Sequence, residues 1–138
     1  MKILVINGHP DKESYCQAIF QNIVENIDSG RHELEVINLN EEDFDPVLRY
    51  GYRKRMKEDS FILRSQELIQ WAEHFIFVYP IWWSSMPSLM KGWIDRVFTP
   101  GIAYSANDQG SFIWNYLRGK QFKKLLKGKI ASIYATSM

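Results

Sequence analysis

The strongest constraint on the fold is that short apolar runs alternate with segments whose apolar residues recur at helical spacing. The apolar runs cover residues 2–6, 34–39, 75–79 and 130–134, and Pro80 is expected to end the third of them. Runs without polar alternation are typical of parallel strands that are buried on both faces. Strands that alternate with helices predict an α/β fold, here a doubly wound parallel sheet in which four strands are visible.

Three amphipathic helices are expected between these strands. Ser14, followed three residues later by Gln17, has the pattern of a capping box, so the first helix should begin there. Asp59 or Ser60 can cap the second helix. Pro87 suits the first position of the third helix, because the N–H that proline lacks is not needed at that position.

Composition and charge exclude several classes of protein. The chain carries 17 basic and 16 acidic side chains, and this formal net charge of +1 argues against a dedicated nucleic-acid-binding protein. One cysteine excludes an internal disulfide framework and a thiolate zinc cluster, and the three histidines lack metal-ligand spacing, so no metal site is expected. The sequence has no leader pattern and no apolar run of membrane length, which predicts a cytoplasmic protein without membrane insertion. Residues 1–138 are expected to form a single domain, with a long connection over 102–127.

Two loops are candidates for a ligand site. In an open parallel sheet, ligands bind beyond the carboxyl ends of the strands, where the strand order reverses. Residues 7–14 and 80–87 both leave such strand ends, and they flank one crevice if the first and third strands are neighbours. The first loop enters a helix N-terminus, which favours a phosphate, and Ser14 and His9 could add contacts; alternatively, Ser14 only caps the helix. A dinucleotide fingerprint and a P-loop are both absent.

The second loop contains two adjacent tryptophans, Trp82 and Trp83, directly after a strand. A flat heteroaromatic ring system could pack against such a surface, with backbone groups bonding its edge. The alternative interpretation is that one tryptophan packs in the core while the other is partly exposed. The residue pattern alone leaves both interpretations open.

Three stretches carry a family resemblance. These are Gly8-His9-Pro10 with Ser14-Tyr15, the long stretch YPIWWSSMPSLMKGWIDRVF over residues 79–98, and residues 101–104. Together they resemble the NAD(P)H:quinone oxidoreductases, a family with a flavodoxin-like fold. The long stretch is specific, and the resemblance extends over essentially the whole chain.

The resemblance implies a flavin, FAD in the first place and FMN as the alternative, in a homodimer. It implies ping-pong hydride transfer from NAD(P)H through the flavin to a quinone-like acceptor. Tyr104 would wall the substrate pocket near the partner subunit. The residues that would contact the flavin, carried over by position, are His9, Ser14, Tyr15, Cys16, Pro80, Ile81, Trp82, Trp83, Ser84, Tyr134, Ala135 and Thr136.

The sequence departs from the family in three places. Cys16 stands where many relatives carry an amide, and a thiol is only a weak hydrogen-bond donor. Residues 134–137 replace a T-T-G-G stretch whose glycines let the backbone approach the flavin ring. Family members also continue for several tens of residues, so we expect this chain to be incomplete at its C-terminus, without a fifth strand, a last helix or the usual catalytic residues. A regulatory subunit of a potassium-efflux system and an inactive truncated relative therefore remain as alternatives.

Overall fold

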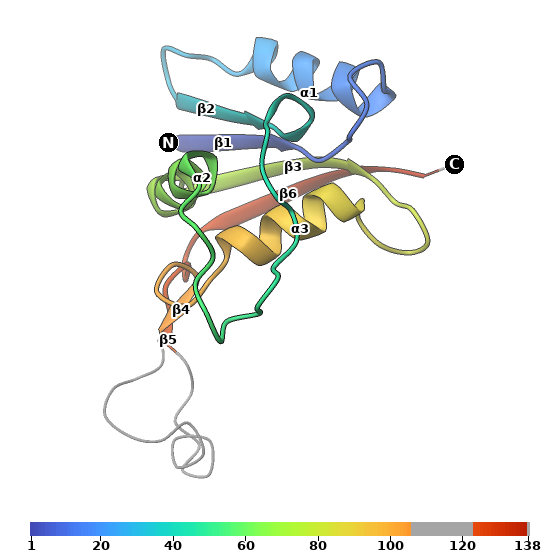
Figure 1. Ribbon diagram of the computed structural model, residues 1–138. Coiled ribbons are helices and arrows are strands. Elements are labelled where there is room, and N and C mark those ends of the chain that lie inside the picture. The colour runs from blue at the N-terminus through green and yellow to red at the C-terminus, as the bar shows by residue number, and fades with distance from the viewer. Residues whose placement is uncertain (106–122, 138) are drawn as a thin grey trace.

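The computed structural model describes residues 1–105 and 123–137, in which four parallel strands form the central sheet in the order β2-β1-β3-β6 (Figure 1). The strands of this sheet are β1 (Lys2–Asn7), β2 (Glu33–Asn38), β3 (His74–Pro80) and β6 (Ile130–Thr136). The helices are α1 (Tyr15–Asn26), α2 (Ser60–Trp71) and α3 (Ser88–Val97). The doubly wound parallel sheet that the sequence predicts is confirmed.

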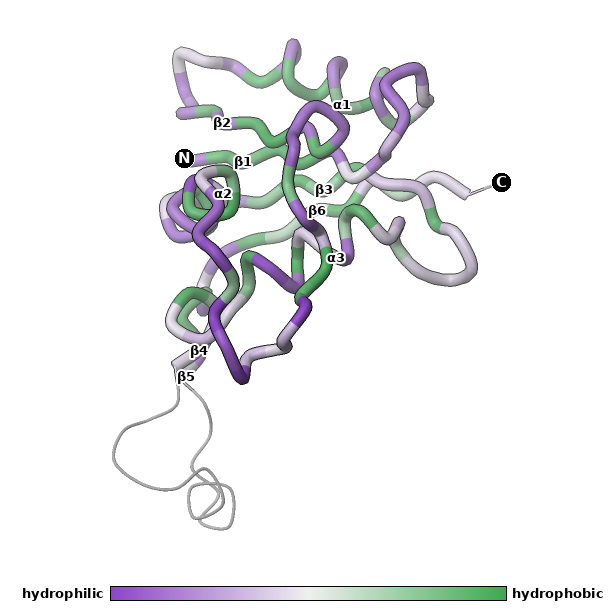
Figure 2. The backbone as a smooth tube through the Cα atoms, in the orientation of Figure 1, coloured by the Kyte–Doolittle hydropathy of each residue, from purple (hydrophilic) through white to green (hydrophobic). Residues whose placement is uncertain are grey.

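The two faces of the sheet are covered by different helices. Helix α1 packs on one face, where Cys16 and Phe20 join a core cluster with alternate residues of β1 and β3. Helices α2 and α3 pack on the other face (Figure 1). Figure 2 shows the hydrophobic colour along β1, consistent with a strand covered on both sides. Within the two described segments, no helix is both long and apolar enough to cross a membrane.

The strand order reverses between β1 and β3, which fixes where a ligand can enter. From β1 the chain crosses to β2 on one side and then returns to β3 on the other side of β1. The carboxyl ends of β1 and β3 therefore lie next to each other, and the backbone N–H of Gly8 donates to Val78 O at 2.8 Å just beyond β1. This places the loops that follow the two strands at one edge of the sheet.

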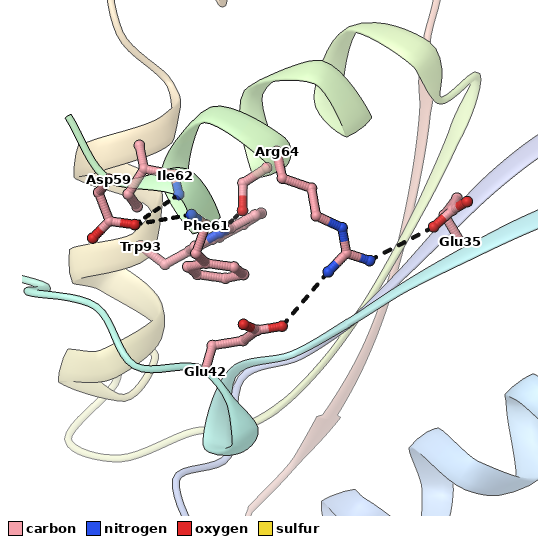
Figure 3. Close-up of polar contacts among 8 residues, drawn as sticks. Glu35, Glu42, Asp59, Phe61, Ile62, Arg64 and Trp93 are labelled. Carbon is pink, nitrogen blue, oxygen red and sulfur yellow. Dashed lines mark hydrogen bonds and ion pairs between the residues drawn. The ribbon is translucent and has the colours of Figure 1, made fainter.

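Helices α2 and α3 are joined by a buried side-chain hydrogen bond. Trp93 is fully buried, and its indole Nε1–H donates to Ser65 Oγ at 3.0 Å, which satisfies the polar end of the ring (Figure 3). Asp59 is the residue that caps α2, and its Oδ1 accepts from the backbone N–H groups of Phe61 and Ile62 at 3.0 and 3.2 Å. The Arg64 ion pairs in the same view are exposed and contribute little.

The structure refines three expectations about element boundaries. β3 ends at Pro80, as the sequence predicts, but includes Pro80 itself, which is in register with Thr136, and the Ile81 N–H donates to Thr136 O at 2.7 Å just beyond it. Pro87 is the N-cap of α3 rather than its first residue, since its ψ of 149° is extended. Leu39 leaves the strand and begins a short 3-10 helix, η1 (Leu39–Glu41).

A small second sheet lies within the segment expected to be a long connection. Strands β4 (Tyr104–Ser105) and β5 (Lys123–Lys124) pair antiparallel. Residues 106–122 of that connection lie outside the described residues. Because β5 ends shortly before β6 begins, this small sheet lies near the amino ends of the central strands (Figure 1).

The segment after η1 is fastened to α3 by close backbone packing. A Cβ at Gly92 would lie 2.4 Å from Pro46 O and 2.5 Å from Pro46 Cβ, so only glycine allows this approach. One turn later, Arg96 Nη1 donates to the backbone carbonyl of Asp45. The N–H of Val47 and the Arg49 guanidinium hold the pKa of the Asp45 carboxyl below its usual value.

We expect Gly92→Ala to lower the free energy of unfolding by about 1–3 kcal/mol, because the added methyl group overlaps the Pro46 backbone. Helix propensity alone would raise it by roughly 1 kcal/mol, so the sign of the change is informative. Urea unfolding measures it. The control is Gly30→Ala, whose Cβ meets only the tip of the exposed Asp28 side chain. A Gly92→Ala variant more stable than the parent chain contradicts this packing.

Candidate functional site

An open pocket of about 200 Å³ lies where β3 and β6 end beside the start of α1. Its lining combines apolar, aromatic and hydroxyl side chains. The residues that line it are Tyr15, Pro80, Ile81, Trp82, Thr136 and Ser137. Five of these six belong to the flavin-contact set that the family resemblance implies, and Ser137 is an addition that the sequence did not single out.

The loops after β1 and β3 meet through an aromatic contact. The rings of His9 and Trp82 lie edge to face, with centroids 5.3 Å apart and planes at 77°. His9 Nδ1 accepts the backbone N–H of Asp11 at 3.0 Å, so the neutral ring carries its proton on Nε2. The structure thus brings the two loops together at one edge of the sheet, with an imidazole donor between them.

The first turn of α1 has the features of an anion site. Ser14 Oγ accepts from Gln17 N–H at 3.2 Å, which leaves the N–H groups of Tyr15 and Cys16 without an acceptor among the described residues. The first turn of α1 contains no acidic residue, although Asp11 and Glu13 come just before its N-cap. Only half of the expected capping box forms, because the Gln17 side chain is bonded to other amides.

The two tryptophans sit in a strained, exposed turn. Trp82 and Ser85 exchange backbone hydrogen bonds of 2.9 and 3.0 Å around the two central residues, Trp83 and Ser84. Both central residues have positive φ, 50° and 59°, a region that side-chain-bearing residues seldom adopt. The interpretation that one tryptophan packs in the core is wrong, since Trp82 is 39% exposed and Trp83 is completely exposed. Strain and exposed aromatic surface of this kind tend to cluster at ligand sites.

Cys16 contacts one of the residues that line the pocket. Its thiol is buried, and Sγ is 3.3 Å from Thr136 Oγ1, a hydrogen bond that links α1 to the end of β6. The departures from the family at positions 16 and 136 therefore contact each other. Tyr134 and Ala135 are exposed on β6 and do not line the pocket.

Tyr104 does not reach the pocket of its own chain. It pairs with Lys124 in the small β4–β5 sheet, near the amino ends of the central strands, whereas the pocket lies at their carboxyl ends (Figure 1). Tyr104 could therefore line a substrate pocket only if that pocket belonged to a second copy of the chain.

The sequence analysis missed a cluster of four amide side chains beside the first loop. These residues are Asn7, Gln17, Asn38 and Asn40. A signal for them existed, because Asn7 and Asn38 end neighbouring parallel strands and stand in register. Across residues 1–105 and 123–137, no group of three or more histidines, cysteines or acidic residues is arranged to hold a metal ion.

The family of this chain follows from its sequence. The pattern of a family described as the flavodoxin-like fold matches residues 1–137. This chain belongs to the flavodoxin-like fold family. Its relatives include ribosyldihydronicotinamide dehydrogenase (quinone) from Mus musculus, 27% identical over 96% of this chain and 66% of that protein. The resemblance to the NAD(P)H:quinone oxidoreductases is thereby confirmed.

Solved structures agree with this membership. Smu.1420 from Streptococcus mutans is 33% identical, with a TM-score of 0.77 over 98% of this chain and 67% of that one. General stress protein 14 from Treponema denticola, solved in complex with FMN, is 25% identical, with a TM-score of 0.62 over 99% of this chain and 62% of that one. The chain spans between 49% and 66% of the length of curated relatives that it matches.

We expect Ser84→Val to lower the free energy of unfolding by about 1–2 kcal/mol, because a β-branched residue is strongly disfavoured at positive φ. Ser84→Gly should not lower it, because glycine adopts this conformation without strain. Urea unfolding measures the change in the free energy of unfolding. Ser85→Val, next in the chain and without positive φ, is the matched control. Equal losses for the two valine variants would show that the turn is not strained.

Proposed function

We propose that this chain is the flavin-binding part of an NAD(P)H oxidoreductase that reduces quinone-like acceptors. The observation that carries the proposal is the pocket that joins an exposed aromatic turn to the N-terminus of α1. The two halves of this site match the two chemically different ends of a flavin nucleotide, a flat ring system and a phosphate group.

The residues of the first loop and of α1 suit the phosphate end. The free N–H groups of Tyr15 and Cys16 at the positive end of the helix favour an anion, and His9 Nε2–H can donate to it. The Ser14 hydroxyl can also donate to an anion while it accepts from Gln17 N–H. All of these groups would bind the phosphate end of the nucleotide, and none of them would take part in electron transfer.

The second loop suits the ring end. Ile81 and Trp82 give an apolar wall, and the exposed Trp83 offers a flat surface that nothing in the described chain covers. Backbone groups of the turn over 82–85 lie next to this surface and could bond the polar edge of the ring. Thr136 supplies a hydroxyl where relatives have glycine, so its side chain, and not only its backbone, would approach the ring.

A bound flavin supplies hydride chemistry between NAD(P)H and a quinone-like acceptor. With one face of the ring against the 80–84 loop, donor and acceptor would use the other face in turn, which corresponds to a ping-pong cycle. We place FMN before FAD, reversing the order that the resemblance implied, because the similar Treponema denticola structure holds FMN. We also propose a homodimer. The substrate-lining role that the family resemblance implies for Tyr104 is possible only in a partner's pocket, because Tyr104 does not reach the pocket of its own chain.

The direct test is titration of the purified protein with FMN and with FAD, followed by quenching of flavin and tryptophan fluorescence. We expect saturable binding with FMN bound at least as tightly as FAD, and NAD(P)H should then bleach the yellow bound flavin. A protein that binds neither flavin would overturn the proposed function.

Trp83→Ala tests the placement of the ring. Because Trp83 is completely exposed, its removal should leave the urea midpoint unchanged. Loss of its stacking surface should weaken FMN binding about fivefold, as expected for an aromatic pair worth roughly 1 kcal/mol. Tyr50→Ala removes an exposed ring far from the pocket and serves as the control. Unchanged FMN affinity in the Trp83→Ala variant would move the ring away from this turn.

A further inference from the structure

The buried end of the first loop is held by side-chain amides and not by apolar packing. Asn7 is fully buried and uses its amide completely. Its Nδ2 donates to Gln17 Oε1 at 2.8 Å and to Asn38 Oδ1 at 2.9 Å, while its Oδ1 accepts the backbone N–H of His9 at 3.1 Å. Asn7 thereby connects β1, α1 and β2 to the histidine of the ligand loop.

Asn40 holds the other side of the same histidine. Its Nδ2 donates to the backbone carbonyl of His9 at 3.2 Å and to Gln17 Oε1 at 3.1 Å. The N–H and the C=O of His9 are therefore both bonded by asparagine side chains that meet at Gln17. The orientation of each amide follows from the network, because every shared oxygen faces donor groups.

Such a cluster is not needed to pair the strands. The β1–β2 ladder runs from Lys2 to Asn7 through its own backbone register, and Ile6 and Ile37, which precede Asn7 and Asn38, are buried and apolar. Burying side-chain amides is unfavourable unless they are bonded, and bonded networks restrict conformation. Asn40 Oδ1 is buried without a partner among the described residues, so the cluster is held by the donor bonds of Asn7 and Asn40. The part of the molecule that this network fixes is the His9 backbone.

We propose that Asn40, with Asn7 and Gln17, is a positioning residue that fixes His9 so that its imidazole faces the ligand pocket. The orientation of the imidazole is then held by two further contacts, the Asp11 N–H on its Nδ1 and the ring of Trp82 from the loop after β3. Asn40 acts through His9 and does not itself touch a ligand. Only the effect of this restraint on ligand binding rests on the proposed flavin site. The restraint on His9 itself is present in the ligand-free protein.

The first test uses the ligand-free protein. Asn40→Ala should speed amide hydrogen exchange at His9 and Asp11 about fivefold, which corresponds to the loss of one typical hydrogen bond. Exchange in the middle of β1 should not change. Asn26→Ala, which removes an exposed amide bond to Asn22 O at the far end of α1, is the matched control and should leave His9 exchange unchanged. Unchanged exchange at His9 and Asp11 in Asn40→Ala overturns the positioning role, whether or not the protein binds a flavin.

The second test asks whether the restraint reaches the ligand. FMN and riboflavin, which lacks the phosphate, are titrated against the parent chain, Asn40→Ala, His9→Ala and the double variant. Asn40→Ala should weaken FMN about fivefold and riboflavin hardly at all, and it should have no further effect once His9 is alanine. Equal losses for both ligands, or the same loss with and without His9, would show a merely structural role. Failure of the parent chain to bind either ligand would contradict the proposed function, while the exchange result still decides the positioning role.

Discussion

The hydrogen bond from Gly8 N–H to Val78 O is the constraint on which the rest of the site depends. It extends the contact between β1 and β3 by one residue beyond the end of β1, so the two ligand loops start from adjacent points. A Cβ at this position would lie 2.4 Å from Met90 Sδ and 3.0 Å from Met90 Cβ on α3, so a larger residue would have to displace the Met90 side chain. The packing of α3 below the sheet thus determines how closely the first loop can approach the second. The contact between His9 and Trp82 is a consequence of this approach.

The features that repeat along the chain could be predicted from the sequence, and the features that depend on single contacts could not. The strands around Leu4 and Val78 are fully buried and apolar on both faces, so they gave an unambiguous signal. Asp59 was predictable as a cap because its carboxylate competes directly for free N–H groups. The two-residue strands β4 and β5 have no periodicity to detect, and Pro87 shifted by one position because its ψ, which proline does not fix, decides where α3 begins.

The site itself was predictable in its chemistry and not in its geometry. Loop position and a helix N-terminus pointed to His9 and Tyr15, and the structure places both beside the same crevice. The positive φ of Trp83 could not be foreseen, because the surrounding residues are not the glycine or asparagine that normally mark such a turn. The amide cluster was equally hidden, since an asparagine at a strand end is usually only a loop residue. The amide cluster is set by tertiary contacts, which local sequence does not record.

The position of β6 has a consequence for the chemistry of the lone thiol. In the part of the chain that the structure describes, β6 pairs with β3 alone, and Ile130, Ile133 and Tyr134 are exposed along it. A strand held on one side opens locally at a lower free energy than the whole domain unfolds. Opening of β6 removes Thr136 from Cys16 and dismantles one wall of the pocket in the same event. Labelling of Cys16 by a thiol reagent in the folded protein therefore becomes possible when α1 and the end of β6 separate.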